Sequence, residues 1–291
     1  MQQLNAQLVI SETLKDIESF FFHSSKFSIK KEYCSSSKQH ASIKGSGPKA
    51  RLIFSKEFCH FEVKNTDDLF EVMIIVCHEV AHYLNKHTDY KDTEAIDFTA
   101  IEAWADFFGA RIFLTTITYG KKTQKQIKKF SGELEQGEIL SSIGRALYSI
   151  YNYFYLTNTD HRYQPARVRV LLFTSGTSSF FYRLYGELKP KFTLYVITKI
   201  LNEAGLTEII SKEHADWEKE SKIGEKIRTI HKEIQGHNIA ITKGIKPQYI
   251  PLLVTNYQLT EAEVSRNQKV LIEQVKATGL DFEIEDFIVK A

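Results

Sequence analysis

The sequence predicts an α+β fold that is mainly helical. Short β-rich segments bounded by turn residues are confined to residues 27–64. Apolar residues recur at helical spacing through much of the remaining chain. We expect the strands to form a small N-terminal sheet against the helix that follows them, and the C-terminal part to be helical.

The expected elements follow one another in a simple order. Residues 1–22 carry the apolar spacing of an amphipathic helix. The β-rich segments are 27–33, 50–54 and 58–63, with a turn at 45–48. Helices are predicted over 66–85, 93–118, 139–156, 165–185, 190–204 and 211–235. A last helix near 260–277 and a short strand over 282–289 complete the prediction.

Composition and charge narrow the classes of partner. The chain of 291 residues carries a formal net charge of +2, which predicts no strongly basic face for nucleic acid. The basic cluster at 121–129 is interpreted as a solvated loop or helix face. No apolar run approaches the roughly 18 residues that a membrane helix needs. We therefore expect neither a nucleic-acid partner nor a membrane span.

Cysteine usage and the N-terminus predict the compartment. Three cysteines without a C-x-x-C pair argue against a disulfide framework and favour a reducing environment. The N-terminus lacks the basic start and continuous apolar core of a signal peptide. We expect a cytoplasmic protein. Residues 1–185 are predicted to form one unit, and 186–291 a helical accessory or substrate-recognition region that could also dock a regulatory partner.

The motif with the clearest chemistry is His78-Glu79-Val80-Ala81-His82. Residues four apart lie on one face of a helix, so both imidazoles can reach one metal ion. Glu79 points about 100° round the helix, beside the metal, where it can take a proton from a metal-bound water. The surrounding sequence is apolar, and a buried helix with three such polar residues needs a reason. The alternative is a chance HExxH pattern without a metal.

A third ligand is expected on the next helix. Glu102 follows His82 by 20 residues, which is enough for the chain to turn and return antiparallel. Asp106 is four residues further on, so both carboxylates share a face. Catalytic zinc usually has three protein ligands and one open position. We expect Glu102 to bind the metal and Asp106 to orient a ligating histidine; the alternative is an amphipathic helix with scattered acids.

The HExxH pattern followed by Glu102 and Asp106 resembles the gluzincin, or thermolysin-like, metallopeptidases. The resemblance covers roughly residues 68–115 and implies a zincin-like core within residues 1–185. It also implies a bound Zn²⁺ ion with three protein ligands, a glutamate as catalytic base and an aspartate that supports one of the ligands. The ligands would be His78, His82 and Glu102, the base Glu79, and the supporting residue Asp106.

A weaker likeness lies at 160–170. Peptidases of the HtpX type have a proline-rich turn followed by an arginine, and the spacing of Pro165 and Arg169 is similar, although no proline directly follows His161. The resemblance implies that His161 stabilises the oxyanion and that Arg169 pairs with Asp106 or Glu102. A capping role or a surface ion pair is the alternative for both. The order of motifs is also similar to that of the Lit-type phage-exclusion peptidases, which cleave a cytosolic protein.

These patterns predict a zinc-dependent endopeptidase that hydrolyses a peptide bond in a cytosolic protein, by a zinc-bound water activated by Glu79. The alternative is a metal-binding sensor or partner-binding module with gated or no proteolysis. We expect the strand at 50–54 to offer an edge to a peptide. Cys77 is interpreted as a core thiol, and the aromatic stretch 148–155 as helix packing or a cleft wall. The remaining histidines are interpreted as ordinary polar residues: His23, His40, His60, His87, His214, His231 and His237.

Overall fold

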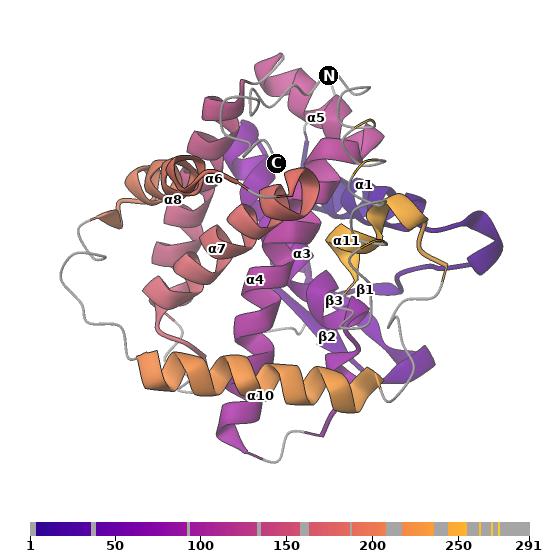
Figure 1. The fold of residues 1–291 in the computed structure, drawn as a ribbon. Coiled ribbons are helices and arrows are strands. Elements are labelled where there is room, and N and C mark those ends of the chain that lie inside the picture. Colours follow the sequence, from indigo (N-terminus) through magenta and orange to yellow (C-terminus); the bar gives the residue numbers. More distant parts are fainter. Residues whose placement is uncertain are drawn as a thin grey trace.

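The protein is mainly helical with one small sheet, as expected (Figure 1). The computed structural model describes residues 4–35, 39–91, 94–132, 135–157, 163–186, 188–207, 217–235 and 244–254, together with residues 262, 269 and 273. Apart from those last three positions, the helix predicted near 260–277 and the strand predicted at 282–289 lie outside the described residues.

Three strands form the sheet, in the order β1-β3-β2. β1 (Lys31–Cys34) runs parallel to β3 (Arg51–Ser55), and β2 (Ala41–Lys44) runs antiparallel to it. The strand expected to offer an edge is therefore the central one, and that prediction is wrong. Both of its sides are paired, so within the described part of the chain β1 and β2 are the edges of the sheet.

The β-rich segment 58–63 is also not a strand. The side chain of Ser55 accepts a hydrogen bond from the backbone N–H of Phe58 and starts the short helix α2 (Lys56–Cys59). The chain then pairs with the N-terminus instead of the sheet: Val63 donates a backbone hydrogen bond to Leu4 over 2.9 Å. Phe58, Cys59 and Val63 are buried but Phe61 is exposed, so burial does not alternate along this segment as it would along a strand.

Two long helices lie at the centre of the molecule. α3 (Thr66–Leu84) is capped by Asn65, whose side chain accepts from the N–H of Asp68 over 2.8 Å. α4 (Ala95–Tyr119) starts with a capping box between Glu94 and Asp97. Both helices are buried along most of their length, since other helices surround them.

The other elements are arranged around this pair (Figure 1). Most lie where helices were predicted, but the basic cluster forms a separate helix, α5. Its N-terminus is capped from another helix, because Asp16 accepts from the backbone N–H of Thr123 over 2.7 Å. The elements are α1 (Ala6–Ser19), α5 (Lys121–Ser131), α6 (Gln136–Ile150), the π-helical turn η4 (Tyr151–Tyr155), α7 (Ala166–Tyr185), α8 (Pro190–Glu203), α10 (Trp217–Gln235) and α11 (Ile250–Leu253).

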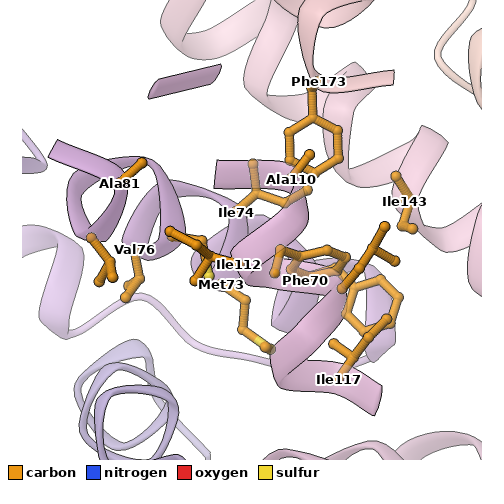
Figure 2. Packing of buried hydrophobic residues seen from close by; sticks show 14 of the residues in the cluster. Phe70, Met73, Ile74, Val76, Ala81, Ala110, Ile112, Ile117, Ile143 and Phe173 are labelled. Atoms are coloured by element: carbon orange, nitrogen blue, oxygen red, sulfur yellow. The ribbon is translucent and has the colours of Figure 1, made fainter. Parts of the chain in front are cut away.

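The main core lies where α3, α4, α6 and α7 meet. Figure 2 shows Phe70 and Ile74 of α3 beside Ile112 of α4, Ile143 of α6 and Phe173 of α7. Side chains from α8 and α11 belong to the same buried cluster, so residues on both sides of position 186 contribute to it. The domain division at that position stays a prediction. No helix in the described part of the chain is long and apolar enough to cross a bilayer.

Candidate metal centre

The two histidines of the motif lie one turn apart on α3. Their Nε2 atoms are 3.3 Å apart, so both rings turn the same nitrogen toward one point. The residues between and beside them hold this face of the helix in place, because Cys77, Val80 and Ala81 are fully buried in the core. The orientation of the two imidazoles therefore follows from the packing of α3.

Glu102 reaches the same point from α4. Its carboxylate oxygens lie 3.2 Å from Nε2 of His78 and 3.5 Å from Nε2 of His82. One ligand atom from each of the three residues lies within 4.8 Å of the other two. Across the described ranges, no other group of three or more His, Cys, Asp or Glu residues converges in this way. The three residues expected as ligands are thus brought together.

The two helices can approach this closely because position 109 is a glycine. A Cβ atom built on Gly109 would lie 3.1 Å from the Cα atom of His78, which is tighter than most contacts of this kind. The backbones of α3 and α4 are therefore in direct contact beside the site.

Charges around the three residues favour a cation between them. Burial alone would lower the pKa of His78, but the charge and hydrogen bonding of Asp106 and Glu102 outweigh it and raise that pKa to about 10. Burial would raise the pKa of Glu102, yet the neighbouring histidines hold it well below its usual range. A divalent metal ion bound there would take the place of the proton on His78, since a ligating imidazole must be neutral.

Asp106 and Arg169 support His78 from behind. Oδ1 of Asp106 lies 2.9 Å from Nδ1 of His78, the ring nitrogen that faces away from Glu102. Arg169 of α7 donates to both carboxylate oxygens of Asp106, over 2.7 and 2.9 Å. Its guanidinium lies over the ring of Tyr155, 3.9 Å from the centroid. The expected pairing of Arg169 with Asp106 is present, and the alternative of a surface ion pair is excluded because both residues are buried.

Glu79 and His78 both line a cavity of about 440 Å³. Desolvation by burial raises the pKa of its carboxyl group, although the two histidines of the motif oppose the shift. A carboxyl with a raised pKa accepts and returns protons nearer neutrality than an exposed one does. Glu79 therefore lies beside the three converging ligands, as the motif predicts, and faces the space where another molecule could bind.

No family model, curated protein or solved structure matches the chain. The chemical interpretation therefore depends on the arrangement of these side chains alone.

The cavity has a charged wall and an apolar one. Asp106 and Arg169 line it beside the motif, and Ile74, Ile150 and Phe173 line it where it enters the core. Residues of the π-helical turn η4 close another side, so part of the aromatic stretch 148–155 forms a cleft wall: Tyr153, Phe154 and Tyr155. Ala41, the first residue of β2, and His40 before it also line the cavity.

Two histidines that no sequence motif selects lie next to the site. Nδ1 of His87 is 3.0 Å from Nδ1 of His82, and Nε2 of His87 is 3.0 Å from Nε2 of His231. Their interpretation as ordinary polar residues is wrong, because both are buried and in contact with a candidate ligand or its neighbour. His87 follows His82 by five residues, which is not a helical spacing, and His231 is 144 positions from His87.

Two further residues singled out in the sequence are His161 and Cys77. His161 lies outside the described residues, so its assignment as an oxyanion donor stays a prediction. Cys77 is fully buried, and burial raises the pKa of its thiol, which fits its interpretation as a core residue.

Proposed function

We propose that the protein is a zinc-dependent endopeptidase. The observation that carries the proposal is the convergence of His78, His82 and Glu102 on one point, with Glu79 beside them on the wall of a cavity. Three protein ligands with a neighbouring carboxylate are typical of catalytic zinc sites, whereas structural sites are closed by four ligands and favour cysteine. When bound there, a zinc ion would supply a Lewis acid that polarises a carbonyl group and acidifies water.

The residues of the chain have distinct roles in this proposal. Glu79 takes a proton from the attacking water and returns it to the leaving nitrogen, which is the work of a general base and then a general acid. Asp106 favours the tautomer of His78 that presents Nε2 to the metal, because its Oδ1 lies 2.9 Å from the opposite ring nitrogen, Nδ1. Arg169 holds Asp106 in that position and balances its buried charge.

The substrate proposed is an extended protein segment. Among the described residues β2 pairs with β3 alone, and its first residue, Ala41, lines the cavity that Glu79 faces. A peptide added along this free edge would run past the candidate metal centre and place an apolar side chain against Ile74 and Phe173. The likeness to the Lit-type peptidases makes a cytosolic protein, in a phage-defence setting, the first target to test.

The test combines metal content with cleavage. Purified wild type should contain about one zinc per chain by elemental analysis, and His78→Ala should contain much less. After induction in cells, new protein fragments identified by mass spectrometry should appear with wild type and be absent with Glu79→Gln, which keeps its zinc. A Glu79→Gln variant with full cleavage activity would show that Glu79 is not the base. A wild type without bound or bindable metal would end the proposal.

A further inference from the structure

Three imidazoles form a line from the candidate metal centre to α10. Nε2 of His82 faces His78 and Glu102, and Nδ1 of the same ring lies 3.0 Å from Nδ1 of His87. His87 belongs to the short 3₁₀ helix η3 (His87–Asp89), and its other nitrogen lies 3.0 Å from Nε2 of His231 on α10. All three rings are buried, so the line is shielded from solvent.

The tautomers in this line depend on one another. A neutral imidazole has one N–H donor and one acceptor nitrogen. If Nε2 of His82 binds a metal, its proton is on Nδ1 and is donated to His87, whose own proton is then on Nε2 and is donated to His231. The opposite direction would place a proton on Nε2 of His82, where the metal needs a lone pair. Both directions of proton donation satisfy the two contacts between the rings. Metal binding is compatible only with donation from His82 to His87 and from His87 to His231.

The last histidine in the line is carried by a helix with its own packing. α10 crosses the N-terminal part of α4, the helix that carries Glu102 (Figure 1). Ile223, Ile227 and Ile230 pack there on a small apolar cluster of α4 that is separate from the main core. Lys226 adds an ion pair to the buried Asp97 over 2.7 Å.

This arrangement gives α10 two kinds of attachment. The isoleucines and Lys226 hold the helix on α4, and His231 extends from it past the ring of Trp104, at a centroid distance of 4.9 Å, to meet His87. Displacement of α10 would remove the acceptor of His87 and leave that ring free to take the other tautomer. The orientation of His82 then loses its support.

We propose that His87 and His231 are positioning residues that hold His82 in its metal-binding tautomer, so that docking of α10 and metal binding strengthen each other. The inference rests on the proposed metal centre but not on peptidase activity. Because coupling between two sites is reciprocal, the factor by which docked α10 raises metal affinity equals the factor by which metal favours docking. A partner that removes α10 from α4 would thereby weaken the metal centre.

Metal affinity is the first test. Zinc binding by the full chain is measured by competition with a chromophoric chelator for wild type, His87→Phe and His231→Phe. Phenylalanine keeps the ring volume and removes the nitrogens. The zinc dissociation constant should rise about 10- to 100-fold in His87→Phe, as is usual when a partner of a ligating histidine is lost, and by a smaller factor in His231→Phe, which acts on His82 through His87. His231→Gln, whose amide oxygen can accept from His87, should recover most of the loss. The matched control is His60→Phe, the same substitution at an exposed position.

Hydrogen exchange of α10 is the second test. Zinc should slow exchange of the backbone amides of residues 222–234 in wild type, and should have no such effect in His231→Phe at saturating zinc. Circular dichroism establishes that the variants are folded, and His231→Gln serves as the folded variant if His231→Phe is not. The inference is overturned if both phenylalanine variants bind zinc within about twofold of wild type, or if zinc leaves α10 exchange unchanged in wild type.

The outcomes separate this inference from the proposed function. A wild type that binds no zinc would overturn both. Zinc-dependent protection of α10 in a chain that cleaves no protein, with Glu79 intact, would support the coupling and contradict the peptidase.

Discussion

Arg169 and Asp106 form a two-point ion pair between α7 and α4, with both side chains buried. Because Asp106 also contacts His78, the pair connects a third helix to the metal ligands. Burial alone would raise the pKa of Asp106, but the charges of Arg169 and His78 lower it, so the carboxylate stays ionised.

Replacing Arg169 by methionine should therefore be costly. It leaves a buried carboxylate without its main partner, and removal of one member of a buried pair typically costs about 3–5 kcal/mol. The matched control is Arg145→Met, which removes a two-point pair with Asp67 at the surface. Exposed pairs contribute about 0–1 kcal/mol. Urea unfolding should show this contrast, and equal losses at the two positions would contradict the importance assigned to burial.

Adding one methyl group at position 109 should disturb the metal centre. Gly109→Ala places a carbon against the backbone at His78, so α3 and α4 must separate, at a cost of about 1–3 kcal/mol for overpacking. Zinc affinity should fall as well, because the ligands come from both helices. Gly224→Ala on α10 is the control, since its new carbon meets nothing within 4 Å and should stabilise the helix by about 0.5–1 kcal/mol. Chemical unfolding and chelator competition measure the two effects.

The cap that α1 provides to α5 should be measurable. Asp16 accepts from the backbone N–H groups of Lys122 and Thr123, which have no partner within the first turn of α5. Asp16→Ala should lower the free energy of unfolding by about 0.5–2 kcal/mol, the usual effect of losing a cap. Zinc affinity should be unchanged, because α5 lies away from the ligands. A loss of zinc affinity comparable to that of Gly109→Ala would contradict this separation.

Acid should destabilise the zinc-free protein partly through His231. Burial lowers the pKa of this histidine from 6.5 to about 4. Between these values the unfolded chain binds a proton that the folded chain does not, so stability is greatest above about pH 6.5 and declines as pH falls toward 4. The contribution is up to roughly 3 kcal/mol, from 1.36 kcal/mol per pKa unit. The pH profile of unfolding in chelator should be steeper for wild type than for His231→Phe; parallel profiles would contradict the assignment.

Zinc should also stabilise the fold as a whole. A ligand that binds only the folded chain raises the free energy of unfolding. The increase is about 2.7 kcal/mol when the free ligand concentration is about a hundred times the dissociation constant. Thermal unfolding should shift upward with zinc in wild type and in Glu79→Gln. His82→Ala should show little shift, and a full shift in that variant would place the binding elsewhere.

The sequence predicted the features of the site that depend on local spacing. His78 and His82 are four residues apart on one helix, and Glu102 and Asp106 repeat that spacing on the next, so both faces follow from helical periodicity. Arg169 could be placed only through a resemblance, since nothing local connects it to α4.

Features that depend on the tertiary fold were missed. The contact between His87 and His231 joins residues 144 positions apart, and no pattern in either segment indicates it. The order of strands is likewise not encoded in any one segment: 50–54 reads as a strand, but its central position follows from where β1 and β2 pair. At 58–63 the apolar residues fit a strand, but Ser55 caps a short helix that begins just before this segment.

Because the backbones of α3 and α4 are in direct contact at Gly109, the arrangement of the ligands and the stability of the protein can vary independently. The spacing of the two ligand-bearing helices is set there by main-chain atoms instead of by the fit of large side chains. Variation in the distant core, such as a smaller residue at Phe70 or Ile143, can then make the protein less stable while the arrangement of the ligands stays the same. Evolution could thus adjust how long the molecule survives in a cell without altering what it binds.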